Sequence, residues 1–174
     1  MKITDQIRKR LIGGLFVGLI VAASSVPAAA QPTMAQAQAI TLKPLSLINL
    51  TPLKFGGVIA GTAAGKVIVD PDNDARSTTG GVTAAGGGPA AARFLTYGGP
   101  LQFVQVNRGP LPVLTRTGGT QKMNVDNLTL NGPVNRFLNG AGLLDLRVGG
   151  QLAVKANQTP GEYTGNFLIY VTYY

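Results

Sequence analysis

Cysteine, histidine and tryptophan are all absent from the 174-residue sequence. Without cysteine and histidine the chain has no thiol or imidazole nucleophile, no Ser-His-Asp triad and none of the usual ligands of zinc, copper and haem. No disulfide can form, so stability has to come from packing and backbone pairing. Acidic residues number seven and aromatic residues make up 6% of the chain. We therefore expect a protein that is not an enzyme and needs no cofactor.

The first thirty residues have the layout of a secretory signal peptide. Basic residues within residues 2–10 precede an apolar run over residues 11–23, and the small residues of SSVPAAA follow. This order of charged, apolar and small residues is typical of a segment that is removed on secretion, here after Ala30 or at the later Ala37-Gln38-Ala39. The apolar run is shorter than the ~20 residues that span a bilayer, so no membrane insertion is expected after cleavage.

Removal of residues 1–30 leaves a single domain with a modest positive charge. The remaining 144 residues hold 11 of the 15 basic and six of the seven acidic residues, for a net charge of +5. The basic residues are spread along the chain and form no stripe with interleaved aromatic residues. Nucleic-acid binding is therefore not expected.

Glycine and proline interrupt the rest of the chain at short intervals, with β-prone runs between them. This spacing is typical of an all-β sandwich or barrel. Strands are expected at residues 45–50, 65–69, 93–97, 102–107, 113–116, 121–130, 143–148, 151–156 and 163–174. Gly149-Gly150 is expected to form a two-residue hairpin turn and residues 80–92 a long surface loop, and residues 133–138 are compatible with a short helical turn.

Three carboxylates alternate in the stretch DPDNDARS, at Asp70, Asp72 and Asp74. Oxygen clusters of this kind suit calcium, but the calcium-binding loop of helix–loop–helix proteins needs a glycine at its sixth position and a distal glutamate. Arg76 and Ser77 stand in that region instead. A solvated hairpin tip built from turn-forming residues is the preferred interpretation, with a calcium site as the alternative.

Two stretches at the ends of residues 31–174 are predicted to be strands. Near the C-terminus, Phe167, Ile169, Val171 and Tyr173 alternate with more polar residues, which indicates a half-buried strand that must pair with something. Before the first domain strand, residues 31–44 (QPTMAQAQAITLKP) contain no glycine, and residues 35–43 can form a spare strand. Its inward face stays open, because Ile40 and Leu42 lie on one side and Ala37 and Ala39 on the other.

The chain resembles a known family at three places: Leu53-Lys54-Phe55-Gly56, Gly149-Gly150 and the stretch PGEYTG at residues 160–165. The family is a proteobacterial group of small secreted domains of unknown function, allied to chaperone–usher pilins and spore-coat-U-like fimbrial subunits. Pilins of that superfamily have a penultimate tyrosine and a glycine fourteen residues from the end, where this chain has Tyr173 and Gly161. Many pilins also carry a disulfide, so the resemblance is to the cysteine-free relatives.

The resemblance implies a pilin-type, immunoglobulin-like β-sandwich over residues 45–174 that is incomplete and is completed by a donor strand from residues 31–44. It implies this donor set: Ala37, Ala39, Ile40 and Leu42. It implies this pairing set on the C-terminal strand: Gly161, Tyr163, Phe167, Ile169, Val171 and Tyr173. The resemblance also implies that a periplasmic chaperone pairs with that strand first and that an identical subunit then replaces the chaperone.

The function that follows is that of a structural fimbrial subunit. It would be secreted, pass through the periplasm and an outer-membrane usher, and polymerise head to tail into adhesive filaments on the cell surface. Two alternatives remain open from the sequence. One is a monomeric, self-complemented secreted adhesin, and the other is a small outer-membrane β-barrel with a C-terminal aromatic residue.

Overall fold

The structure is a computed structural model that describes residues 36–174. The expected signal peptide, residues 1–30, and the start of the expected donor segment, residues 31–35, lie outside the described residues. Residues 40–174 form one compact unit, whereas residues 36–39 belong to a separate N-terminal unit.

The described residues form eleven strands and no helix, so this part of the chain has no helix that could cross a membrane. The strands are β1 (Ser46–Thr51), β2 (Val58–Val69), β3 (Arg76–Ala84), β4 (Ala92–Tyr97), β5 (Phe103–Arg108), β6 (Val113–Arg116), β7 (Lys122–Leu130), β8 (Asn135–Phe137), β9 (Leu143–Val154), β10 (Tyr163–Thr164) and β11 (Ile169–Tyr173).

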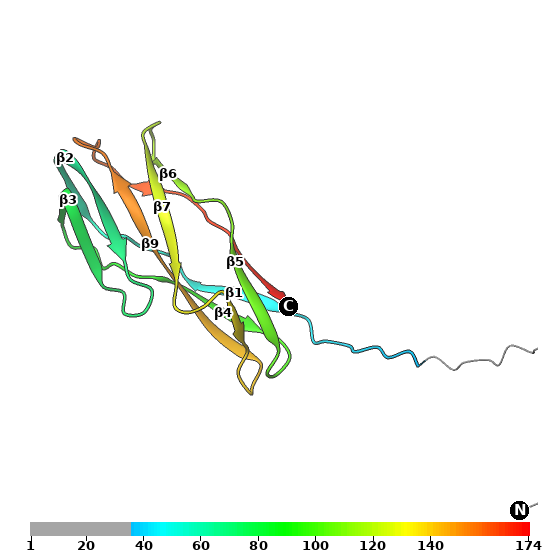
Figure 1. Ribbon diagram of the computed structural model, residues 1–174. Helices are drawn as coiled ribbons and strands as arrows, with labels where there is room; N and C mark the ends of the chain where they lie inside the picture. The colour runs from blue at the N-terminus through cyan, green and yellow to red at the C-terminus, as the bar shows by residue number, and fades with distance from the viewer. Residues whose placement is uncertain (1–35) are drawn as a thin grey trace, which may run out of the picture. The chain divides into compact units, whose positions relative to one another are not determined.

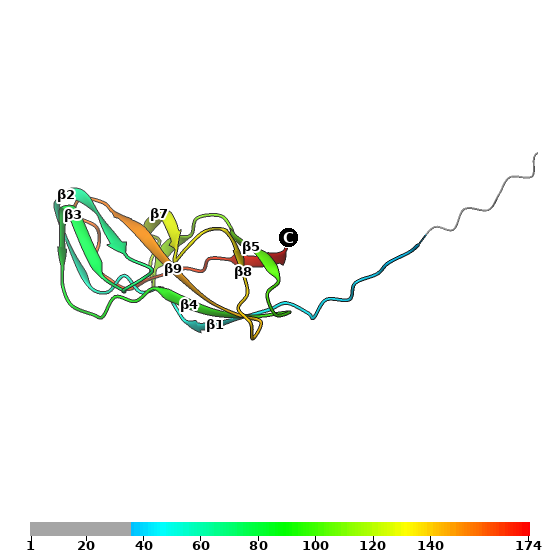
Figure 2. The same cartoon turned by 60° about the horizontal axis from the view of Figure 1, so that its bottom comes forward.

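The strands make two antiparallel sheets. The larger has the order β1-β4-β9-β7-β6-β10, and the hairpin of β2 and β3 joins it through the second half of β9. The smaller has the order β11-β5-β8. Figures 1 and 2 show the long strand β9 running through the middle of the domain, with β4 and β7 beside it. The prediction of an all-β, sandwich-like fold is confirmed.

The core is built on β9 because its side chains alternate strictly. Leu146, Val148, Leu152 and Val154 are buried on one face of the strand, as a two-residue period requires. The smaller sheet contributes Val106 to the same cluster. Other buried members of this cluster are Val67, Val82, Ala92, Met123, Val125 and Leu128. β-Branched and leucine side chains pack densely on pleated surfaces, and this packing stabilises the fold without disulfides.

The prediction of a hairpin at Gly149-Gly150 is wrong, because β9 continues straight through both glycines. Neither has a positive φ. Gly149 instead lets the chain after β2 cross closely over β9, since a Cβ there would lie 2.2 Å from the Val69 carbonyl oxygen. Glycine inside a strand often marks such a close backbone approach.

The prediction of a surface loop over residues 80–92 is wrong at its start, because residues 80–84 belong to β3. The backbones of β2 and β3 lie very close at a register shift, where a Cβ on Gly81 would come 2.2 Å from the Ala63 carbonyl oxygen. Glycine therefore permits this pairing. Residues 135–137, within the expected helical turn, form the short strand β8 through pairing with β5.

The predicted C-terminal strand over residues 163–174 is divided in two. β10 pairs with β6 in the larger sheet, and β11 pairs with β5 in the smaller one. Gly165 lies where the chain leaves β6, and a Cβ there would be 2.8 Å from the Val113 carbonyl oxygen. The crossing between sheets therefore interrupts the alternation that the sequence suggested.

Candidate functional site

The candidate site lies at two sheet edges, those of β1 and β11. β1 ends the larger sheet and pairs with β4, and β11 ends the smaller sheet and pairs with β5. Among residues 36–174, no strand pairs with the other edge of either one. A free edge presents unpaired N–H and C=O groups that can template a further strand.

The hydrogen-bond pattern shows which β11 residues face its free edge. The Gly109 N–H donates to the Leu168 carbonyl at 2.8 Å, and the Tyr174 N–H donates to the Phe103 carbonyl at 3.1 Å. Antiparallel pairs alternate, so even-numbered residues of this strand bond to β5. The main-chain groups of Ile169, Val171 and Tyr173 therefore point away from β5.

The same reasoning applies to β1. The Gly98 N–H donates to the Gly142 carbonyl at 2.9 Å, which assigns the even-numbered residues of β4 to β9 and the odd-numbered ones to β1. Ser46 and Ile48 are the residues of β1 that bond to β4. Leu45 and Leu47 consequently direct their main-chain groups to the free edge.

Apolar side chains at these edges face inward yet are incompletely covered. Leu45, Leu47, Ile169, Val171 and Tyr173 are all half-buried. On the neighbouring strand β5, the inward-facing Val104 and Val106 are 0% and 1% exposed.

The free edge of β3 differs from the edges of β1 and β11. Its inward-facing Val82 is 6% exposed, so the core beneath β3 is covered. Incomplete cover along β1 and β11 therefore does not follow from their position at a sheet edge alone.

Contacts join the β1 side of the larger sheet to the β11 side of the smaller sheet near both ends of these strands. At one end the rings of Phe94 and Phe167 make an edge-to-face contact with centroids 6.1 Å apart. At the other, the Tyr173 hydroxyl donates to the Lys43 carbonyl at 2.8 Å, just ahead of β1. Phe94 pairs with Asn49, late in β1. β1 and β11 therefore run in opposite directions along the two facing edges.

The pairing set expected from the sequence is divided by the structure. Phe167, Ile169, Val171 and Tyr173 come together at the free edge of the smaller sheet. Tyr163 lies in β10 on the larger sheet, where its hydroxyl donates to the Thr159 carbonyl at 2.7 Å.

Gly161 lies just before β10, away from the free edge of β11. Its φ is +146°, and a Cβ there would lie 2.5 Å from Arg116 Nε. The sequence matched Gly161 to a pilin position, whereas the structure gives it a local packing role.

The expected donor residues lie in no strand of the structure. Ala37, Ala39, Ile40 and Leu42 are exposed, and Ile40 and Leu42 have 87% and 48% of their surface accessible. Ile40 is the most exposed of the large apolar residues in the described part of the chain.

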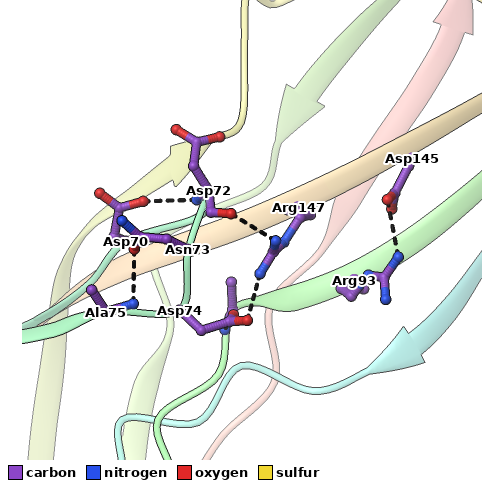
Figure 3. Close-up of polar contacts among 9 residues, drawn as sticks. Asp70, Asp72, Asn73, Asp74, Ala75, Arg93, Asp145 and Arg147 are labelled. Atoms are coloured by element: carbon purple, nitrogen blue, oxygen red, sulfur yellow. Dashed lines mark hydrogen bonds and ion pairs between the residues drawn. The ribbon is translucent and has the colours of Figure 1, made fainter.

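The acidic loop of residues 70–75 is closed by its own hydrogen bonds (Figure 3). Asp70 accepts from the Asp72 N–H at 2.7 Å, and Asp74 forms an ion pair with Arg147 at 2.6 Å. The carboxyl group of Asp72 points away from that of Asp74 (Figure 3). No group of three acidic residues that could hold a metal ion occurs in the described part of the chain. The loop instead fixes the end of the β2–β3 hairpin on β9.

Asp74 carries a prediction about pH. Its pKa lies below its ordinary value because the Ala91 N–H and the Arg147 guanidinium both bond to the ionised carboxylate. A lowered pKa in the folded state stabilises the fold above the ordinary pKa, and that contribution is lost as the pH falls through the folded value.

Asp74→Asn should therefore lower the free energy of unfolding at pH 7 by about 1 kcal/mol or less, since the side chain is partly exposed. The deficit should shrink below about pH 4. The measurement is urea unfolding at several pH values. Asp145→Asn is the control, because it removes the more exposed ion pair with Arg93. A deficit for Asp74→Asn that persists unchanged in acid contradicts the prediction.

The larger-sheet half of the site was missed by sequence reasoning. Leu45, Leu47 and Phe94 had been placed in ordinary strands, with no sign that one edge would stay uncovered. The alternation of Leu45 and Leu47 was a usable signal for the inward face. Edge position depends on the strand order, which a single sequence does not specify.

Residues 45–173 match the model of a family described as "Domain of unknown function (DUF4402)". No curated protein and no solved structure matches the chain. The expectation of a family of domains of unknown function is thus confirmed, and its alliance with pilins stays a prediction.

Proposed function

We propose, from the premise that this chain belongs to the DUF4402 family, that its domain is a filament subunit that takes a β-strand from another copy of itself. The acceptor is the pair of facing edges on β1 and β11. The donor is residues 31–44 of the next subunit. Repetition of this exchange builds a surface fimbria after secretion, with a periplasmic chaperone holding the acceptor until assembly.

One observation supports the proposal: the same edge residues have half-buried apolar side chains and main-chain groups with no partner strand. Ile169 and Val171 on β11 have both features. Leu47 on β1 and Leu45, which directly precedes β1, have them too. One inserted strand would satisfy both at once, because its backbone pairs with an edge while its side chains complete the core.

The exposed residues Ile40 and Leu42 fit the donor role. They lie on the same side of an extended chain and leave much of their surface accessible to water. Burial of each side chain would contribute about 1.5–3 kcal/mol. Main-chain hydrogen bonds add roughly 1 kcal/mol net each, so a completed core makes a durable joint between subunits.

Donor and acceptor are different surfaces of one chain, which sets the form of the assembly. A contact between unlike surfaces is heterologous, and it produces an open filament unless the rotation closes into a ring. Head-to-tail growth is therefore the expected outcome, as a fimbria requires.

Deletion of residues 31–43 tests the proposal. The truncated subunit keeps its acceptor and has no donor, so it should still bind a periplasmic chaperone and form no fibres. Sheared cell-surface material examined by negative-stain microscopy gives the readout, and co-purification from the periplasm measures chaperone binding.

A matched control replaces residues 31–39 with a Gly/Ser stretch of equal length and keeps Ile40 and Leu42. This variant should retain part of the assembly, because both large side chains remain. Normal fibres from the truncated subunit contradict the proposal. A closed monomer that has its own residues 35–43 beside β11 would instead support the self-complemented adhesin.

A further inference from the structure

We propose that Tyr173 is a positioning residue that keeps the chain's own donor segment out of its own acceptor, so that the segment is available to a second copy. This inference rests on the proposed function, and it concerns how the molecule chooses between self-insertion and exchange.

The Tyr173 hydroxyl bonds to two separate parts of the backbone. It accepts the Gly99 N–H at 2.9 Å and donates to the Lys43 carbonyl at 2.8 Å. A Cβ on Gly98 would lie 2.6 Å from this hydroxyl and 2.9 Å from Leu45 Cδ1, so the surroundings are tightly packed. The chain ahead of β1 is thereby tied to the end of β11 at Lys43.

Self-insertion would require the chain to reverse direction at this tied point. β1 and β11 run in opposite directions, and the chain enters β1 beside Tyr173. Residues 36–42 could reach their own acceptor only by folding back along β1, with Lys43 and Pro44 as the two residues of a hairpin turn.

The hairpin would otherwise be well matched. Leu45 directs its main-chain groups to the free edge, as the first residue after a two-residue turn must do to pair with Leu42. Leu42 would then stand opposite Leu45, and Ile40 opposite Leu47, with all four side chains on the inward face. The strand register therefore permits self-insertion, and only the conformation of the turn can disfavour it.

Lys43 and Pro44 make that turn unfavourable. A type I′ turn needs positive φ at both central residues, which the locked φ of proline excludes. A type II′ turn needs positive φ at Lys43, and the residue before proline favours an extended conformation. Tyr173 adds a second restraint, because its hydroxyl occupies the Lys43 carbonyl. Consistent with both, Ile40 and Leu42 are exposed in the single chain.

Tyr173→Phe removes the hydroxyl and keeps the ring. For this test residues 31–174 are produced with a secretion signal, and size-exclusion chromatography separates monomers from multimers. The ratio of monomer to multimer should rise about fivefold, the shift expected for loss of one hydrogen bond. Tyr174→Phe is the matched control, because Tyr174 is 80% exposed and the structure gives its hydroxyl no bond within residues 36–174.

The double variant Lys43→Asn with Pro44→Gly tests the turn without touching Tyr173. Asn-Gly is the preferred pair for a type I′ hairpin. This variant should be predominantly monomeric, with an acceptor that no longer binds a labelled peptide of residues 31–44. Loss of peptide binding thereby distinguishes a monomer whose acceptor holds its own residues 36–42 from a monomer whose acceptor is free.

The outcomes separate this inference from the proposed function. Wild-type protein that neither forms multimers nor binds the peptide overturns the proposed function. Wild-type protein that assembles, together with variants that assemble equally well, overturns the role of Tyr173 and the turn. Tyr173→Phe could instead lower the melting temperature while its monomer-to-multimer ratio equals that of Tyr174→Phe. That result assigns Tyr173 a structural role only and also overturns the inference.

Discussion

Substitution of Val171 by aspartate should abolish assembly and weaken binding of a peptide of residues 31–44 by at least about 100-fold. Val171 faces inward from the middle of β11 and is half-buried before any donor arrives. Strand addition would bury its side chain fully. Burial of an unpaired carboxylate costs several kcal/mol, and each 1.4 kcal/mol is about tenfold in affinity.

Thr172→Asp is the matched control for this substitution. Thr172 is the next residue on the same strand, and its exposed side chain points to the opposite side of the sheet. The same charge is added one position away, and threonine, like valine, is β-branched, so assembly should be nearly unchanged. Fibre yield by microscopy and peptide affinity by fluorescence anisotropy are the two measurements.

Circular dichroism and urea unfolding distinguish lost assembly from lost folding. Val171→Asp should keep the all-β spectrum, because the half-buried position retains access to water in the single chain. Equal loss of assembly in both variants would show that charge near β11 is what matters and would contradict a role for its inward face. Normal assembly of Val171→Asp would mean that no strand covers that face.

The sequence predicted half of the candidate site. The alternation of Phe167, Ile169 and Val171 gave the inward face of β11, because a two-residue period is a local property. It could not show that the strand breaks at Gly165, because the break depends on which strand each part pairs with. Leu45 and Leu47 were placed in a strand whose edge position depends on the order of the whole sheet.

Glycine is the main reason that parts of the fold could not be predicted. At Gly149-Gly150 and in residues 80–84 it was taken as a sign of a turn or loop, which is its commonest meaning. The structure uses it in both places to let backbones approach closely. A single sequence does not distinguish the two uses, because the atom that would clash belongs to a distant segment.

Gly149 and Gly150 offer a direct test of this second use. A Cβ on Gly149 would lie 2.2 Å from the Val69 carbonyl oxygen and 2.8 Å from Pro71 N, so rigid backbone would have to move. A Cβ on Gly150 would meet its nearest atom, Leu53 Cδ2, at 3.1 Å, and that side chain can shift. Its nearest backbone atom, the Asn127 carbonyl oxygen, would be 3.3 Å away, so a far smaller movement is needed than at Gly149. Both glycines have ordinary φ values, so alanine costs neither of them conformational strain.

Gly149→Ala should therefore lower the free energy of unfolding by about 3 kcal/mol, the upper range for overpacking, while Gly150→Ala should change it by less than about 1 kcal/mol. Urea unfolding of the two variants side by side measures the difference. Because the residues are adjacent in one strand, β-propensity and chain entropy change equally in both. Equal losses would mean that the chain after β2 does not pass close to Gly149, and the path of the chain around the core would then have to be revised.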